Sequence, residues 1–263
     1  MAQDERLKNF ANRERLRRQL QKSEGRLKEA SIIQKALNVT GPEMLKEGMS
    51  APHVFEKYPH LSDEFNKGIQ AESLLLMIDL SPFSSLVANW PPEQIICFLE
   101  KYYHIVVGRV SDKGGVVEKY IGDAVIAAFG RPFDETTSPE HLRRIINLSR
   151  SLIKEVELEF EGEVTAKCAI AYGICHYGYV GPSIHSELTI IGTPLTELFR
   201  LESDCPARSV ILRKSLFEVV TESFPITPGH APEAAKIPWV FKEETRELRG
   251  VGDVEVVIFS LES

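Results

Sequence analysis

The stretch from Gly114 to Gly130, GGVVEKYIGDAVIAAFG, most constrains how this chain can fold. Two apolar runs, residues 116–121 and 124–129, flank the pair Gly122-Asp123. A Gly-Asp pair between β-branched runs is typical of a β-hairpin with a tight turn. The sequence therefore predicts a hairpin that presents the Asp123 carboxylate at a rigid tip.

Glu118 and Lys119 are the charged residues inside the two strands of this hairpin. A charge buried in a strand costs free energy unless a partner compensates it. For an isolated hairpin we therefore expect both side chains on the solvated face. A second carboxylate upstream favours a different role for the hairpin. The run Ser73–Asp79 (SLLLMID) is typical of a buried strand that ends in an acid.

The elements around these strands indicate a fold class. Pro91-Pro92 opens a helix predicted over 93–113, and Ser138-Pro139-Glu140 opens another that ends near Glu157. A strand is predicted over 164–172. The order strand, helix, hairpin, helix, strand is the βαββαβ pattern. It predicts an α+β domain with a ferredoxin-like antiparallel sheet and helices on one face.

The remaining elements extend this core and lead to three predicted parts of the chain. We expect residues 1–46 to form a helical arm, 47–72 a connecting segment and 73–263 the folded body. Beyond the core the pattern predicts a strand or hairpin over 173–181, a helix over 194–202, a strand over 209–213, a helix over 213–220 and an edge strand over 254–261.

Charge is distributed unevenly along the chain. Residues 1–50 hold 11 Lys and Arg against 7 Asp and Glu, whereas the remainder holds 20 against 31. An acidic body argues against nucleic-acid binding, while the basic arm can dock on another copy of the body or form a solvated helix. The absence of a long apolar run or a secretory signal, together with four widely spaced cysteines, predicts a soluble cytoplasmic protein without a membrane span or structural zinc.

Asp79 and Asp123 are the residues that suggest chemistry. In a βαββαβ sheet the two central strands lie side by side, so these carboxylates can converge. Two carboxylates with few other ligands suit Mg²⁺ or Mn²⁺, which also bind phosphate oxygens. Two such ions would activate a hydroxyl and stabilise a leaving pyrophosphate. The spacing is equally compatible with two unrelated turn aspartates.

Four blocks of the sequence resemble class III nucleotidyl cyclases, in the order and spacing of that family, over roughly residues 70–261. The segment MIDLSPFSSL (77–86) is similar to the one that begins at the family's first metal-binding Asp. EKYIGDAVIAAFG (118–130) resembles the second-metal hairpin. LTIIGTPLTELFRLES (188–203) and LRGVGDVEVVIF (248–259) resemble the segment with the transition-state arginine and the closing segment.

The resemblance implies a catalytic role for five residues. Asp79, Asp123 and the carbonyl of Leu80 would hold two Mg²⁺ or Mn²⁺ ions per site. Arg200 falls on the arginine that stabilises the pentavalent phosphate, a task suited to a planar, permanently charged guanidinium. Thr196 replaces the family's Asn, and its hydroxyl would orient the ribose more weakly.

The resemblance also implies a set of substrate contacts. Lys119 and Thr189 match the base-contacting pair of adenylate cyclases, and Arg249 stands where the family has a triphosphate-binding Lys. Phe83 and Ser84 are further expected substrate contacts. In the family these groups come from two subunits, which implies a homodimer with active sites at the subunit interface.

The base of the substrate stays open between uracil, cytosine and adenine. Glu197, Leu198 and Phe199 replace small family residues, and a Phe199 that faces the pocket would favour a pyrimidine; both bulky residues can instead pack in the core. The stand-alone architecture resembles the Pycsar pyrimidine cyclases of anti-phage defence, so UTP, giving cUMP, leads. Lys119 and Thr189 favour ATP. A catalytically silent nucleotide-binding module and a dimeric scaffold are the rivals from other classes.

Overall fold

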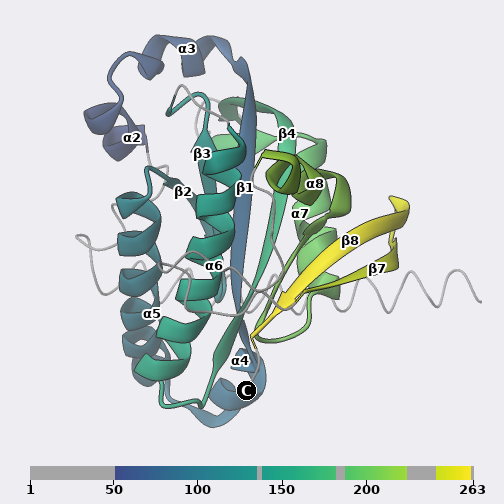
Figure 1. The fold of residues 1–263 in the computed structure, drawn as a ribbon. Helices are drawn as coiled ribbons and strands as arrows, with labels where there is room; N and C mark the ends of the chain where they lie inside the picture. The colour runs from purple at the N-terminus through teal and green to yellow at the C-terminus, as the bar shows by residue number, and fades with distance from the viewer. Residues whose placement is uncertain (1–50, 135–137, 182–186, 224–240, 262–263) are drawn as a thin grey trace, which may run out of the picture. The chain divides into compact units, whose positions relative to one another are not determined.

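The computed structural model describes residues 51–134, 138–181, 187–223 and 241–261, all of which lie in one compact unit, Met44–Ser263 (Figure 1). The predicted helical arm, residues 1–46, lies outside the described residues. Among the helices that are described, none is both long enough and apolar enough to cross a membrane.

Helices and strands alternate along the described chain, with the labels of Figure 1. The elements are α2 (Ala51–Lys57), α3 (Leu61–Lys67), β1 (Ile69–Ser81), α4 (Phe83–Leu86), the 3₁₀ helix η2 (Val87–Asn89), α5 (Pro92–Asp112), β2 (Val116–Ile121), β3 (Ala124–Gly130), α6 (Pro139–Glu159), β4 (Thr165–Val180), β5 (Glu187–Ile191), α7 (Thr193–Asp204), β6 (Ser209–Arg213), α8 (Lys214–Ser223), β7 (Phe241–Leu248) and β8 (Gly252–Ser260).

The strands form one sheet in the order β2-β3-β1-β4-β6-β8-β7, and β5 pairs with β4 outside this path. The succession β1, α5, β2, β3, α6, β4 confirms the predicted βαββαβ core and the α+β class. The antiparallel prediction holds for the other described pairs, but β4 and β6 run parallel, so the sheet is mixed. The parallel pair arises because β4 reaches β6 through the crossover helix α7.

Helices cover both faces of the sheet, not one face as predicted. On one face, Cys168 of β4 contacts the carbonyl of Ser149 in α6, and α5 lies beside α6 (Figure 1). On the opposite face, Leu198 and Leu201 of α7 pack in the same core cluster as Met77 of β1. A central sheet with apolar residues on both faces requires a helix layer on each.

Two strands are longer than their apolar runs predict. The first begins at Ile69, before the predicted Ser73, and the predicted elements over 164–172 and 173–181 form the single strand β4. β1 and β4 pair in register from Ile69↔Tyr177 to Ser81↔Thr165. The ladder satisfies backbone groups beyond the apolar run, so hydrogen bonding extends the strands past the hydrophobic signal.

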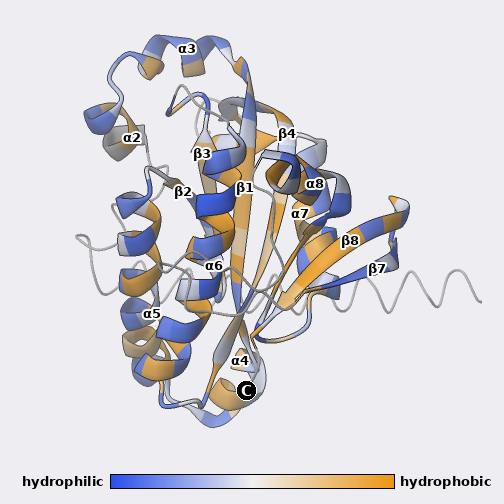
Figure 2. Ribbon diagram, in the orientation of Figure 1, coloured by the Kyte–Doolittle hydropathy of each residue, from blue (hydrophilic) through white to orange (hydrophobic). Residues whose placement is uncertain are grey.

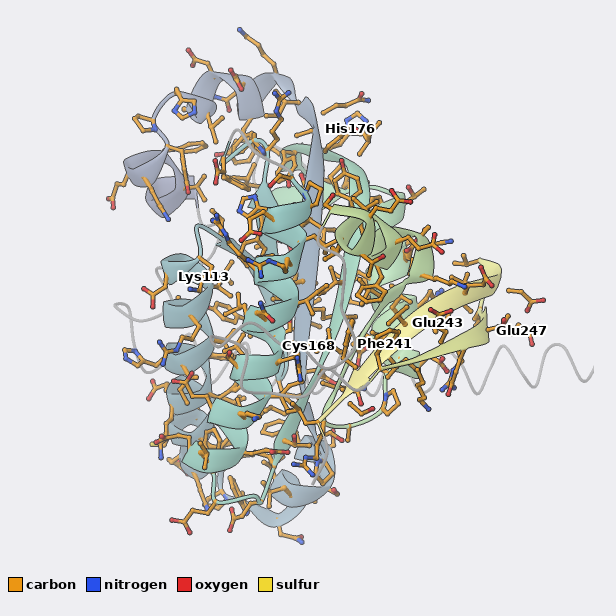
Figure 3. All side chains as sticks on the ribbon, viewed as in Figure 1. Lys113, Cys168, His176, Phe241, Glu243 and Glu247 are labelled. Atoms are coloured by element: carbon orange, nitrogen blue, oxygen red, sulfur yellow. The ribbon has the colours of Figure 1, made fainter. Side chains whose placement is uncertain are left out.

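The C-terminal strand β8 is not the edge strand that its sequence predicts. It lies between β6 and β7, and β7 forms the edge. Figure 2 shows β7 as hydrophilic and β8 as hydrophobic, and Figure 3 shows Glu243 and Glu247 of β7 projecting at this border. These charged side chains discourage pairing of the edge with another chain. They also remove the apolar alternation by which a strand is recognised in the sequence, so β7 was not predicted.

Candidate active site

The carboxylates of Asp79 and Asp123 lie next to each other, at the end of β1 and at the tip of the β2–β3 hairpin. β1 pairs with β3 as far as Ile78↔Val125, which brings the turn beside the strand end. The Asp123 carboxylate accepts a hydrogen bond from the Leu80 N–H, and the two aspartates are hydrogen-bonded to each other. The convergence expected from the βαββαβ order is therefore present; we call these residues the aspartate pair.

The aspartate pair is electrostatically strained. Burial, followed by the charges of Asp123 and Glu202, raises the pKa of Asp79 to about 8. Burial also raises the pKa of Asp123 to about 6, although hydrogen bonds from backbone N–H groups and from Asp79 oppose the increase. Two acids held together in a poorly hydrated place cannot both ionise without a compensating cation.

Lys167 and Glu202 complete the charge cluster, and neither was singled out from the sequence. The Lys167 Nζ lies 3.5 Å from Asp79 Oδ2 and 2.7 Å from Glu202 Oε1. Lys167 stands opposite Asp79 in the β1–β4 register, and Glu202 is on the buried side of α7. A lysine inside the apolar strand predicted over 164–172 was the available signal, because a buried charge needs a partner.

The donor set fits a hard divalent ion. The aspartate pair supplies closely spaced carboxylate oxygens at the end of a strand, and such oxygens are the ligands that Mg²⁺ and Mn²⁺ prefer. Among the described residues, no group of three or more His, Cys, Asp or Glu side chains has a metal-binding arrangement. Any ion here would therefore need further oxygens from a carbonyl such as that of Leu80, from water or from substrate phosphates.

Two adjacent tyrosines of α5 hold the backbone beside each aspartate. The Tyr102 hydroxyl donates to the carbonyl of Ile78 at 3.3 Å, and the Tyr103 hydroxyl donates to the carbonyl of Gly122. Each acceptor directly precedes an aspartate in the sequence. One turn of helix therefore fixes both halves of the aspartate pair.

The expectation that Glu118 projects to solvent is wrong. A β-bulge between Val117 and Lys119 adds Glu118 as an extra residue, and its side chain is only 2% exposed. It accepts hydrogen bonds from the Thr189 hydroxyl at 3.0 Å and the Ile190 N–H at 3.3 Å. A bulge re-aims side chains, which sequence alternation cannot anticipate.

Lys119 is partly exposed, as expected, and its ammonium lies among acids. Its Nζ is 3.4 Å from Glu187 Oε2 and 3.9 Å from Glu118 Oε1. Because Thr189 donates to that same Glu118 oxygen, the structure brings Lys119 and Thr189 into one neighbourhood.

The residues matched on α7 divide between two faces of the helix. Thr196 and Arg200, four residues apart, lie opposite the buried Leu198, and among the described residues Arg200 has no hydrogen-bond or ion-pair partner. Leu198 is fully buried, and Phe199 is partly buried against the same core. The bulky residues therefore pack at least partly within their own domain.

The remaining matched residues lie apart from the aspartate pair. Arg249 is exposed in the β7–β8 turn, at the opposite end of the sheet order from the β2–β3 hairpin. The Phe83 ring is buried against Phe98, at 5.8 Å between centroids, so a substrate contact from Phe83 would have to use its backbone. Ser84 is exposed on α4.

Sequence comparisons find distant relatives. No family model matches the chain. Two uncharacterized proteins of Mycobacterium tuberculosis are 31% and 28% identical to it over 134 residues, which is 51% of this chain and 24% of each relative. The chain thus spans about a quarter of the length of these relatives.

Structure comparisons identify the fold. The catalytic core of a rhodopsin-guanylyl cyclase with converted specificity, in complex with ATPαS, matches with a TM-score of 0.60 and 17% identity, over 74% of this chain and 99% of that one. The adenylyl cyclase CyaB from P. aeruginosa matches with a TM-score of 0.60 and 16% identity, over 74% and 97%. A bacterial light-regulated adenylyl cyclase matches with a TM-score of 0.57 and 20% identity, over 79% and 60%. The chain therefore has the fold of the class III adenylyl and guanylyl cyclase catalytic domains.

Proposed function

We propose that this protein is a nucleotidyl cyclase, which converts a nucleoside triphosphate into its 3′,5′-cyclic monophosphate and pyrophosphate. The single observation that carries the proposal is the aspartate pair, partly buried and mutually hydrogen-bonded at the end of the central strand of a cyclase fold. In this reaction the substrate 3′-oxygen bonds to the α-phosphorus, the bond to the pyrophosphate oxygen breaks, and the hydroxyl proton is released.

The proposed roles follow from position and charge. Asp79, Asp123 and the Leu80 carbonyl would hold two Mg²⁺ or Mn²⁺ ions, which when bound supply positive charge for hydroxyl activation and for the triphosphate. Arg200 would stabilise the charge that develops on the α-phosphate, and its guanidinium has no partner among the described residues. Thr196, on the same side of α7, would orient the ribose.

We place the complete active site between two copies of the chain. Within one copy, the aspartate pair lies at the end of β1 and the tip of the β2–β3 hairpin. Thr196 and Arg200 lie on the face of α7 opposite its buried residues. Arg249 is at the far end of the strand order. A homodimer that brings the aspartate pair of one copy to the outer α7 face of the other would assemble two equivalent sites. Arg249 would then bind the triphosphate, with Ser84 and the Phe83 backbone nearby.

A pyrimidine triphosphate is our leading substrate class, with the product acting as a second messenger in anti-phage defence. Phe199 is only partly buried and stands three residues after Thr196 on α7, so its exposed part would reduce the space for a base bound beside Thr196. Leu198 no longer supports a small pocket, because it packs in the core. Within this class the sequence favours UTP, and ATP is the alternative that Lys119 and Thr189 favour.

The direct test is to incubate the purified protein and Mn²⁺ with each of the four triphosphates and to measure cyclic product and pyrophosphate. Asp123→Asn should lose at least about a hundredfold in rate, because a neutral amide cannot replace the carboxylate. Asp63→Asn, on the exposed side of α3, is the control. Equal product from Asp123→Asn and wild type would remove the assigned role of Asp123. Nucleotide-dependent thermal stabilisation without pyrophosphate release would instead identify a silent binding module. If nucleotides neither stabilise the protein nor release pyrophosphate, the scaffold role is the one that remains.

A further inference from the structure

The buried carboxylate of Glu118, on the edge strand β2, contacts Thr189 on β5. In the strand order, β3, β1 and β4 separate β2 from β5, yet Glu118 Oε1 lies 3.0 Å from Thr189 Oγ1. Leu188 and Ile190 of β5 belong to the same core cluster as Val116 of β2. Glu118 thus contacts the proposed base-reading residue directly.

The direction of this hydrogen bond is fixed by a second donor. The same oxygen, Glu118 Oε1, accepts the backbone N–H of Ile190 at 3.3 Å. A backbone N–H can only donate, so Oε1 acts as an acceptor whether or not the other carboxyl oxygen carries a proton. The Thr189 hydroxyl therefore donates its single proton to Glu118 in this hydrogen bond. Its lone pairs are what it can still offer to a ligand.

Lys119 supplies the opposite polarity beside it. Its ammonium has three N–H donors and no acceptor, and it lies 3.9 Å from the Glu118 oxygen that Thr189 contacts. The Lys119 side chain is 36% exposed, and Glu187, its other partner, is 61% exposed, so a ligand can displace that contact. Lys119 and Thr189 together present one donor and one acceptor.

We infer that Glu118 is a positioning residue that makes Thr189 a hydrogen-bond acceptor, so that the site selects bases with an amino group next to an acceptor ring nitrogen. Cytosine and adenine carry this pattern on their pairing edges, whereas uracil and guanine carry a carbonyl next to a ring N–H. This inference rests on the proposed function. Combined with the pyrimidine preference, it replaces UTP with CTP as the leading substrate, and it keeps ATP ahead of GTP.

Binding measured without turnover tests the inference separately from catalysis. The probes are the four 3′-deoxynucleoside triphosphates with Mg²⁺, which lack the attacking hydroxyl, used in equilibrium dialysis with the full chain. We expect 3′-deoxy-CTP to bind at least about tenfold more tightly than 3′-deoxy-UTP. The same preference should hold for 3′-deoxy-ATP over 3′-deoxy-GTP, since a mismatched edge sets its N–H against Lys119 and its carbonyl against Thr189. If none of the four binds, the proposed function fails. If they bind with uracil or guanine preferred, the inference alone fails.

Matched variants separate polarity from folding. Thr189→Val removes the acceptor at nearly constant shape and should bring the CTP-to-UTP affinity ratio close to one, while Thr189→Ser keeps it. Glu118→Leu should also collapse the ratio, and Glu118→Gln, whose amide oxygen can still accept both hydrogen bonds, should restore it. Thr221→Val on α8 is the control for a remote threonine. A wild-type ratio in Thr189→Val, or a collapsed ratio in Glu118→Gln, would overturn the inference even if the Glu118→Leu variant does not fold.

Discussion

The Tyr103 hydroxyl donates a hydrogen bond to the carbonyl of Gly122, the residue directly before Asp123. Gly122 adopts φ +63°, in the left-handed region, as the tight turn at the hairpin tip requires. The Tyr103 hydroxyl thus links the turn that carries the carboxylate to α5. The proposed metal site consequently depends on a helix that contributes no ligand to it.

Removing this hydroxyl should affect catalysis more than stability. We expect Tyr103→Phe to lower kcat about tenfold, because a small displacement of Asp123 disturbs the geometry of the site. The free energy of unfolding should fall by only about 1 kcal/mol, the usual net value of one hydrogen bond. Steady-state cyclase assays and urea unfolding measure the two quantities. Tyr58→Phe, whose ring packs against Phe133, is the control and should change neither quantity. A Tyr103→Phe variant with wild-type kcat would contradict the bracing role.

The raised pKa of Asp79 predicts how stability depends on pH without metal. In the unfolded chain this carboxyl loses its proton near pH 3.8, whereas in the folded protein burial raises its pKa to about 8. Between these values the folded state binds more protons, so the free energy of unfolding falls as pH rises. The stabilisation is fully present below about pH 4 and is lost through about pH 8. Asp123, with its pKa raised to about 6, acts in the same direction.

Chemical unfolding in EDTA between pH 5 and pH 8.5 measures this dependence. The difference between wild type and Asp79→Asn isolates the aspartate from other titrating groups, and it should change by roughly 1 kcal/mol per pH unit near the middle of the range. Mg²⁺ should restore more stability at pH 8 than at pH 5, since ligand carboxylates must be deprotonated to bind it. Parallel curves for the two proteins would show that Asp79 titrates normally.

Lys167 should stabilise the fold because its ammonium lies between the carboxyl groups of Asp79 and Glu202. Lys167→Met leaves Asp79 and Glu202 facing each other and should cost about 3 kcal/mol of unfolding free energy. Adding Glu202→Gln should recover part of that loss, which a double-mutant cycle measures. Lys242→Met removes an exposed ion pair with Glu244 and should change stability by less than about 0.5 kcal/mol. Equal effects of the two lysine substitutions would contradict a special role for Lys167.

Residue pattern and topology explain what the sequence could predict. The Gly122-Asp123 turn, the flanking apolar runs and the helix-opening prolines are local signals, so the hairpin, α5, α6 and the convergence of the aspartate pair follow from them. Glu118 and Lys167 depend on pairing across the sheet. A bulge buries Glu118, and the register of β4 against β1 places Lys167 beside Asp79. Neither the bulge nor the partner is encoded in the alternation of one strand.

The second face of helices was missed for a similar reason. An apolar strand predicts that both faces of the sheet are buried, but it does not identify the later element that packs on the second face. Leu198 and Leu201 of α7 cover the face that the βαββαβ pattern leaves open. Their spacing predicts an amphipathic helix, but only the crossover from β4 to β6 decides on which side of the sheet it packs. The outward direction of Thr196 and Arg200 follows from that choice.

Gly192 tests how closely the start of α7 packs, and Gly108 in α5 provides a comparison. A Cβ on Gly192, just before α7, would come within 2.9 Å of the backbone carbonyl oxygen of Ile174, which has little room to yield. Gly192→Ala should therefore shift the start of α7, lower the free energy of unfolding by about 2 kcal/mol and lower kcat through Arg200. A Cβ on Gly108, inside α5, would meet no atom within 4 Å, so Gly108→Ala should stabilise the protein by about 1 kcal/mol through helix propensity. Thermal unfolding and cyclase assays of both variants compare the two sites, and a Gly192→Ala protein as stable and active as wild type would show that α7 is not held by this contact.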